Sequence, residues 1–254
     1  MNFLVKRIVA IVVAFSLIST LTGCATYQMH PEFKERHKSI KSVSLMPPGV
    51  EAYVLTFQGD KKILKDLIPI MEKTTAEQIE KIFSDKGYQI KKLDLSEKTL
   101  EANPELRTSL FHVNELFKKS LEDIVSRKKK SFTYALGPDV NTFANLADCD
   151  ILIFIKEDGV KKSAGEIAKD VVKGCVITAA CLLVGVVNVP IPQTCATLVH
   201  VAIVDSNDGA VLWYNNNLCN QNYDPENQKQ LAGLIKSLIS PFPESVFKEK
   251  APKK

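Results

Sequence analysis

Five consecutive apolar residues, Ile151 to Ile155, place the strongest constraint on how this chain can fold. A strand with one face in water alternates apolar and polar side chains, whereas an unbroken apolar run of this length is typical of a strand buried on both faces. Such a strand needs neighbours in a sheet and packed layers around that sheet. We therefore expect Ile151 to Ile155 to form the central strand of an α/β domain.

Hydrophobic periodicity and turn residues predict the elements that precede this strand. Apolar residues that recur at intervals of three and four indicate helices, and Pro47-Pro48 must end a strand because proline cannot continue a hydrogen-bonded ladder. The predicted elements are a strand at 40–45, an extended segment at 52–57, a helix at 68–83 ended by Gly87, a strand at 88–93, a helix beginning at Asn103-Pro104-Glu105 and reaching 124, and a short helix at 138–146.

The carboxyl-terminal part of the chain predicts a hairpin and a final helix. Two apolar segments, 196–204 and 210–216, flank the turn-forming sequence Asp205-Ser206-Asn207-Asp208-Gly209, which indicates an antiparallel pair of strands. A helix is then expected up to Ile239, where Pro241 and Pro243 end it.

Together these elements predict one α/β domain over residues 40–245. We expect a small mixed sheet of three to five strands with a carboxyl-terminal antiparallel hairpin, packed with helices. Residues 100–130 form a helical insertion, residues 163–195 form an apolar insertion, and residues 246–254 form a charged tail.

The apolar insertion contains fourteen residues, 174–187, among which only Thr178 is polar. A run of this length is typical of a helix buried in a core or shielded by a neighbouring subunit. An interfacial or re-entrant membrane segment is a second interpretation. A pore-forming β-hairpin is a third, although such hairpins alternate apolar and polar residues and this run does not. The sequence leaves these three interpretations open.

The amino terminus has the features of an export signal. Lys6 and Arg7 precede an apolar run at 8–18, which is too short to span a bilayer but long enough for a signal-peptide core. Leu21-Thr22-Gly23-Cys24 follows, and it resembles the lipobox of bacterial lipoproteins. That resemblance implies cleavage between Gly23 and Cys24, removal of residues 1–23, and attachment of a diacylglyceryl group to Cys24, with fatty acyl chains such as palmitate.

Residues 24–39 are predicted to form the lipidated amino terminus and a polar tether. Ala25 follows Cys24, whereas Asp at this place would favour retention at the inner membrane. We therefore expect an outer-membrane anchor that faces the periplasm, with the cell surface or the inner membrane as alternatives.

Export also sets the redox environment of the remaining cysteines. Cys149, Cys175, Cys181, Cys195 and Cys219 are candidate disulfide partners in an oxidising compartment, and the sequence leaves their pairing open. No CxxC pair and no nearby histidine accompanies them, so neither a metal site nor a thioredoxin-like site is expected.

Motifs for catalysis are missing from the sequence. The net charge of +4 is too small for a dedicated nucleic-acid binder, and no nucleotide, zinc-protease or serine-hydrolase motif is present. Residues 205–209 resemble the start of a calcium loop, but the glycine comes one position early and Asn216 stands where the closing glutamate belongs. Asp148 and Asp150 are interpreted as capping residues. We expect a non-enzymatic protein without cofactor, metal or small-molecule substrate.

The order of these features resembles one group of bacterial lipoproteins. A strand ending in Pro47-Pro48, a Gly87-Tyr88 step after a helix, Asp150 before an apolar strand and Gly209-Ala210-Val211-Leu212-Trp213 in the hairpin follow the lipobox. This order is similar to lipoproteins with the fold of the TolB amino-terminal domain. These include a meningococcal surface-antigen family and, more distantly, the curli secretion channel lipoprotein and the activators of penicillin-binding proteins.

That resemblance implies a function without catalytic residues. We expect a lipid-anchored periplasmic protein that acts by protein–protein contact in outer-membrane or cell-envelope assembly, with other envelope proteins or further copies of itself as partners. The alternative is an oligomeric secretion or pore-forming lipoprotein that resembles the curli channel.

Overall fold

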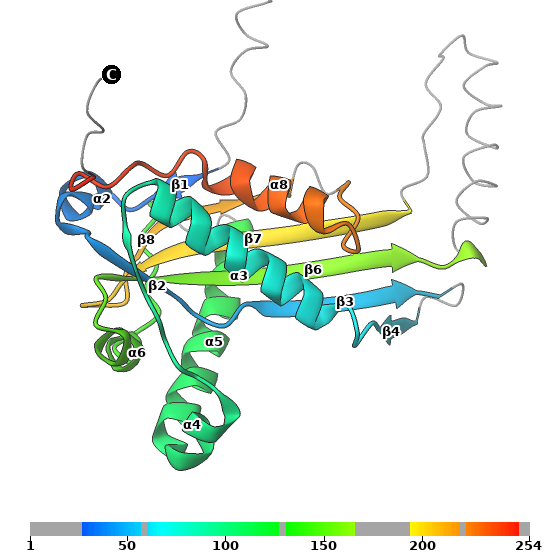
Figure 1. Cartoon of the computed structure of the whole chain (residues 1–254), viewed down its shortest axis with the longest axis horizontal. Coiled ribbons are helices and arrows are strands. Elements are labelled where there is room, and N and C mark those ends of the chain that lie inside the picture. The colour runs from blue at the N-terminus through cyan, green and yellow to red at the C-terminus, as the bar shows by residue number, and fades with distance from the viewer. Residues whose placement is uncertain (1–26, 57–59, 127–130, 166–193, 219–221, 249–254) are drawn as a thin grey trace, which may run out of the picture.

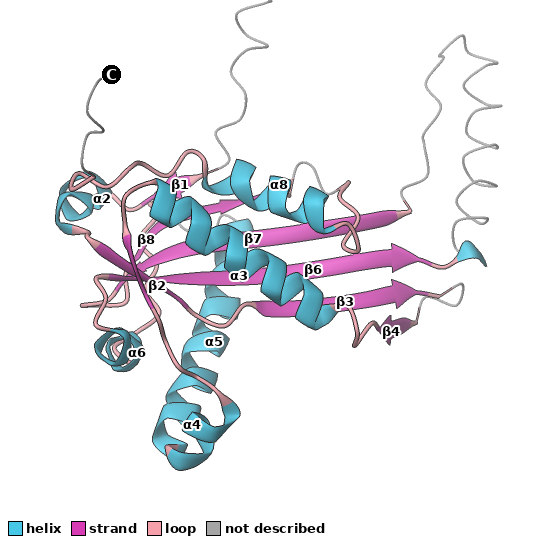
Figure 2. Ribbon diagram, in the orientation of Figure 1, coloured by secondary structure: helices cyan, strands magenta, loops and turns pink. Residues whose placement is uncertain are grey.

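The computed structural model describes residues 27–56, 60–126, 131–165, 194–218 and 222–248, and these residues form an open mixed sheet of eight strands with helices on both faces. Figure 1 and Figure 2 show the sheet between its helical layers. The strands are β1 (Gln28–Met29), β2 (Ser42–Leu45), β3 (Gly49–Leu55), β4 (Lys61–Ile63), β5 (Gln89–Lys91), β6 (Ile151–Lys162), β7 (Cys195–Asp205) and β8 (Val211–Asn216).

The sheet is organised around β6, which confirms the predicted central strand. The main path of the sheet is β1-β8-β7-β6-β2-β5. β7 pairs antiparallel with one edge of β6, and both β2 and β3 pair parallel with its other edge. The Pro47-Pro48 step separates β2 from β3, so the predicted end of the first strand is confirmed. The long strand β6 therefore pairs with two short strands along the same edge. β4 extends the sheet beyond β3.

Side chains alternate along β6 between two apolar cores. Ile151, Ile153 and Ile155 face the core under α3 (Ile68–Asp85) and α8 (Gln228–Ile239). Leu152 and Phe154 face the opposite core, which the other helical layer covers. That layer consists of α4 (Glu97–Ala102), α5 (Pro104–Val125) and α6 (Val140–Ala147). The unbroken apolar run therefore exists because each face of the strand has its own core.

Most predicted elements are found close to their expected positions. The two amphipathic helices appear as α3 and α5, and the predicted helical insertion contains the end of α4 and all of α5. The carboxyl-terminal hairpin appears as β7 and β8, paired antiparallel across the 205–209 turn. Gly87 follows α3 with a φ of 87°, a left-handed conformation that glycine adopts without strain and that ends a helix.

The expected number of three to five strands is wrong, because the sheet has eight. Two of the additional strands, β1 and β4, contain only two and three residues and lie at edges of the sheet. Edge strands this short carry no alternation that a sequence pattern can detect. Their hydrogen bonds depend on the neighbouring strand.

The predicted tether differs most from the structure. Residues 28–39 contain β1, the helix α2 (Phe33–Arg36) and a 3₁₀ turn at His37–Ser39, and both Phe33 and His37 are buried. Arg36 holds this segment through ion pairs with Asp205 and Asp208 of the β7–β8 turn, at 3.1 and 2.7 Å. The described part of the predicted tether is therefore folded against the sheet.

Several predicted features lie outside the described residues. These are the signal segment 1–23 with Leu21, Thr22, Gly23 and Cys24, the apolar run 174–187, and the end of the charged tail at 249–254. Among the described residues, no helix combines the length and apolar character needed to cross a bilayer.

Candidate functional site

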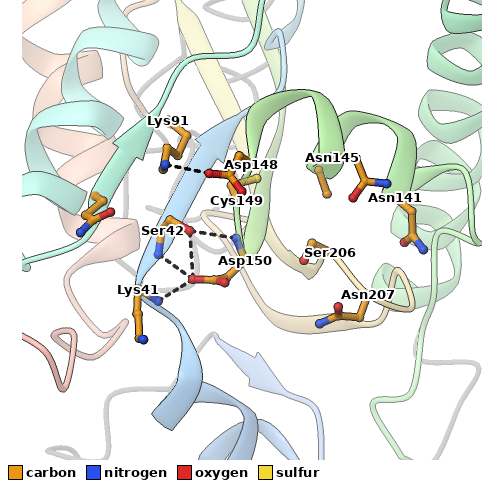
Figure 3. Close-up of a pocket in the computed structure, with 12 residues that line it drawn as sticks. Lys41, Ser42, Lys91, Asn141, Asn145, Asp148, Cys149, Asp150, Ser206 and Asn207 are labelled. Carbon is orange, nitrogen blue, oxygen red and sulfur yellow. Dashed lines mark hydrogen bonds and ion pairs between the residues drawn. The ribbon is translucent and has the colours of Figure 1, made fainter.

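A polar cleft opens at the end of the sheet where β2, β5 and β6 begin (Figure 3). Its volume is about 440 Å³. Short segments that are distant in the sequence line it, namely the start of β2, strand β5, helix α6 with the turn into β6, and the turn after β7. The lining residues are Lys41, Ser42, Gln89, Lys91, Asn141, Ala144, Asn145, Asp148, Cys149, Asp150, Ser206 and Asn207.

Asp150 joins β6 to the first parallel strand at the floor of this cleft. Its Oδ2 accepts hydrogen bonds from the backbone amides of Lys41 and Ser42, each at 2.8 Å, and from the Ser42 hydroxyl at 2.9 Å. The Ser42 hydroxyl in turn accepts a hydrogen bond from the Asp150 amide at 3.0 Å. The hydrogen bonds of this carboxylate therefore hold the start of β2 beside β6.

Asp148 ends helix α6 in a left-handed conformation with a φ of 50°. Aspartate tolerates this conformation better than most residues. Its carboxylate is 92% exposed and forms an ion pair with Lys91 at 3.1 Å. The interpretation of Asp148 and Asp150 as capping and turn residues is confirmed, since one ends a helix and the other connects two strands.

Asp150→Asn is expected to lower the free energy of unfolding by about 1 to 2 kcal/mol, because a neutral amide oxygen replaces a charged acceptor of three hydrogen bonds. Asp148→Asn is the matched control, and it should change that free energy by less than about 0.5 kcal/mol, because its ion pair is exposed. Urea unfolding of both variants measures the difference. Equal losses would contradict the role assigned to Asp150.

The Cys149 thiol is the one sulfur nucleophile at the cleft, and it is buried. Burial and the nearby carboxylates of Asp150 and Asp148 raise its pKa to about 12. A thiol with such a pKa is protonated at neutral pH, whereas the thiolate is the reactive form. Cys149 is therefore a packing residue in this environment.

The groups left to face a ligand are amides, hydroxyls and lysines. Asn141 and Asn145 line the cleft from α6, and Asn207 lines it from the turn after β7. The Asn141 Oδ1 is buried, and none of the described residues donates a hydrogen bond to it. The amide side chains bind polar partners such as a peptide backbone, and amides neither transfer protons nor attack carbonyl carbons readily.

The position of the cleft differs from that of the usual ligand site in open α/β sheets. Ligands of open α/β sheets bind outside the carboxyl ends of parallel strands. This cleft lies at the amino ends of β2 and β6. Within the described ranges, no group of three or more His, Cys, Asp or Glu side chains is arranged to hold a metal ion.

Each of the two described histidines outside the amino-terminal segment has a hydrogen-bond partner in the folded chain. The Nδ1 of His200 lies 2.6 Å from the Tyr214 hydroxyl, and burial lowers the pKa of His200 to about 4. The Nδ1 of His112 lies 2.6 Å from Asp139. Neither ring is placed at the polar cleft.

Two of the candidate disulfide cysteines are described, and both are free thiols. Cys195 pairs with Lys161 near the far end of β6, whereas Cys149 precedes Ile151 at its start. More than ten residues of strand separate these positions, about 33 Å at the rise of a β-strand, so the two cannot bond to each other. Cys175, Cys181 and Cys219 lie outside the described residues.

A second, more apolar groove of about 600 Å³ lies where α4 joins α5, beside α6. Ala102, Pro104 and Leu106 line one side, and the half-exposed Leu146 lines the other. Sequence reasoning predicted neither the cleft nor this groove, because each combines short segments that are distant in the chain. The only signal was the concentration of Asn and Asp residues at 141–150.

Comparisons with known proteins identify no relative of this chain: no protein-family model, no curated protein and no solved structure matches it.

Proposed function

We propose that this chain is a lipid-anchored protein of the bacterial cell envelope that acts by contact with other envelope proteins and not by catalysis. The lipobox Leu21-Thr22-Gly23-Cys24 supports the anchor, which we place at the outer membrane facing the periplasm. The mixed α/β sheet is compatible with a relationship to the TolB amino-terminal domain, which we retain as part of this proposal.

The chemistry of the polar cleft is the observation that carries the contact function. Its partly buried carboxylate, Asp150, holds the backbone of β2, and its thiol, Cys149, is protonated at neutral pH. The amides of Asn141, Asn145 and Asn207 remain to line the opening. A surface of this kind is suited to an extended segment of a partner protein, whose backbone supplies both donors and acceptors.

Replacing Cys24 with alanine tests the anchor. The parent chain should incorporate radioactive palmitate and sediment with membranes, and Cys24→Ala should lose the label and move to the soluble fraction. This change should be nearly complete, since acyl chains contribute about 0.8 kcal/mol per buried methylene. Cys149→Ala is the matched control, because it removes a cysteine of the folded domain and leaves the lipobox intact. Unchanged labelling in Cys24→Ala would refute the lipobox interpretation.

The second arm of the test concerns contact through the cleft. A photocrosslinking amino acid at Asn145 or Asn207 in intact cells should give a discrete protein adduct, and the same probe at Glu77 on the outer face of α3 should not. Adducts between copies of this chain would favour the oligomeric alternative. No protein adduct from either cleft position would contradict the proposed contact function.

A further inference from the structure

The first described residues of the chain are attached to one edge of the sheet. Tyr27 stacks on Trp213, with ring centroids 6.2 Å apart, and β1 pairs antiparallel with β8. The His30 amide donates to the Leu212 carbonyl at 2.9 Å, which continues the same edge. The polypeptide is therefore fixed to the domain from Tyr27 onward.

Only two residues, Ala25 and Thr26, separate Tyr27 from the proposed lipid-bearing Cys24. Consecutive Cα atoms are 3.8 Å apart, so the Cα of Cys24 lies within about 11 Å of that of Tyr27 whatever conformation the intervening residues adopt. A free tether over 24–39 would instead have allowed a separation of about 50 Å. The anchor thus leaves the domain almost no freedom to move away from the bilayer.

We propose that the β1–β8 edge of the sheet lies directly against the membrane surface that holds the lipid anchor. This inference rests on the proposed lipidation of Cys24. β1 is one end of the strand order, and β5 is the other. In Figure 1, β1 and α8 lie along one side of the molecule, and β4 and α4 lie along the opposite side. The opposite side therefore projects away from the bilayer.

The chemistry of α8 and Met29 fits a surface of anionic phospholipid headgroups. Helix α8 lies beside β8, where the Asn215 side chain donates to the Leu238 carbonyl at 2.7 Å. Lys229 and Lys236 are exposed on α8, and its sequence contains no acidic residue. Met29 of β1 is 39% exposed. Lysines close to such a surface are attracted to it, and an exposed apolar side chain can enter the headgroup region.

This orientation also decides which surfaces a partner can reach. The groove between the α4–α5 junction and α6 lies on the side of the molecule that faces away from the bilayer. A partner that approaches from the side away from the bilayer can therefore reach this groove, whereas α8 faces the bilayer.

Site-specific photocrosslinking of the full, lipidated chain in intact cells tests the orientation. A photoreactive amino acid replaces Met29 or Lys236 on the proposed membrane side, and Ile63 or Lys98 on the opposite side. The pairs are matched, because Met29 and Ile63 are exposed apolar residues of edge strands, and Lys236 and Lys98 are exposed helical lysines. Phospholipid adducts, identified by mass, should exceed those of the matched control by on the order of fivefold at Met29 and at Lys236, since contact is confined to a layer of about 5 to 10 Å.

A linker variant provides an independent check. Twelve Gly and Ser residues inserted between Thr26 and Tyr27 add about 19 Å of average reach, so the lipid adducts at Met29 and Lys236 should fall toward the control level. Lipidation is measured in the same cells by palmitate labelling. A labelled chain with equal lipid adducts on both sides overturns the orientation alone, whereas a chain that carries no lipid overturns the proposed anchor as well.

Discussion

Replacing Glu157 with glutamine is expected to reduce, by about 2 kcal/mol, the loss of stability that the protein undergoes between pH 5 and pH 8. Glu157 lies on β6 and is completely buried under α3. The Thr75 hydroxyl donates to its Oε1 at 2.5 Å, and none of the described residues donates to its Oε2. Burial raises the pKa of Glu157 to about 7, and the nearby carboxylates of Glu72 and Asp158 add to the increase.

The direction of the pH effect follows from this raised pKa. In the unfolded chain the carboxyl group has its ordinary pKa of 4.5, whereas the folded protein retains the proton up to about pH 7. The folded state therefore binds more protons between these values, and stability falls as the pH rises through that window. Between pH 5 and pH 8 the loss from this residue amounts to about 2 to 3 kcal/mol, because one pKa unit corresponds to 1.36 kcal/mol.

Urea unfolding of the full chain in detergent at pH 5 and at pH 8 measures this loss for each variant. Glu157→Gln should show a difference between the two pH values that is smaller than that of the parent by about 2 kcal/mol. Glu77→Gln is the matched control, since it removes a carboxyl group from the outer face of α3, where the side chain is 69% exposed. It should retain the pH dependence of the parent. An unchanged pH dependence in Glu157→Gln would show that Glu157 is not protonated in the folded protein.

Phe33→Ala should destabilise the protein by about 3 kcal/mol, as the loss of a buried phenylalanine commonly does. Phe33 belongs to α2 and is 5% exposed. Its ring packs against Phe242 and His37, with centroids 5.8 and 5.5 Å away. These contacts join the amino-terminal segment to the residues that follow α8, and the short connection to Cys24 depends on them.

The neighbouring residue supplies the control for this prediction. Lys34 lies in the same four-residue helix and is exposed, so Lys34→Ala should change the free energy of unfolding by less than about 0.5 kcal/mol. Chemical denaturation monitored by the fluorescence of Trp213, which is buried in the same core, measures both variants. If Phe33→Ala is as stable as Lys34→Ala, Phe33 does not hold this segment in the core, and the attachment of residues 28–39 rests on β1 and Arg36.

The predicted elements succeeded where the information is local. The apolar run at Ile151 to Ile155 needs two buried faces, and the apolar spacing in α3 and α5 needs one buried face each. The hairpin at 205–209 follows from turn residues between two apolar segments. Each of these features is a property of a few consecutive residues, and any fold that buries them must form the same element.

The predictions failed where the stabilising partner is distant in the sequence. Phe33 lies in a short segment rich in charged residues, and only its contact with Phe242 makes that segment part of the core. The strand β1 has two residues, and its hydrogen bonds exist because β8 presents a free edge. The cleft was not predicted for the same reason, since residues from β2, β5, α6 and the turn after β7 meet only in the folded chain.

The amino-acid sequence by itself determined the alternating helices and strands and the central position of β6, and it is the basis of the proposed anchor at Cys24. Only the tertiary structure decided that Glu157 is buried and that Asp150 accepts hydrogen bonds from the backbone of β2. It also decided that the chain is attached to the sheet from Tyr27 onward. The physical reason is that periodicity and turn chemistry act between neighbours along the chain. Burial, pKa and the reach of an anchor instead depend on which distant residues the fold brings into contact.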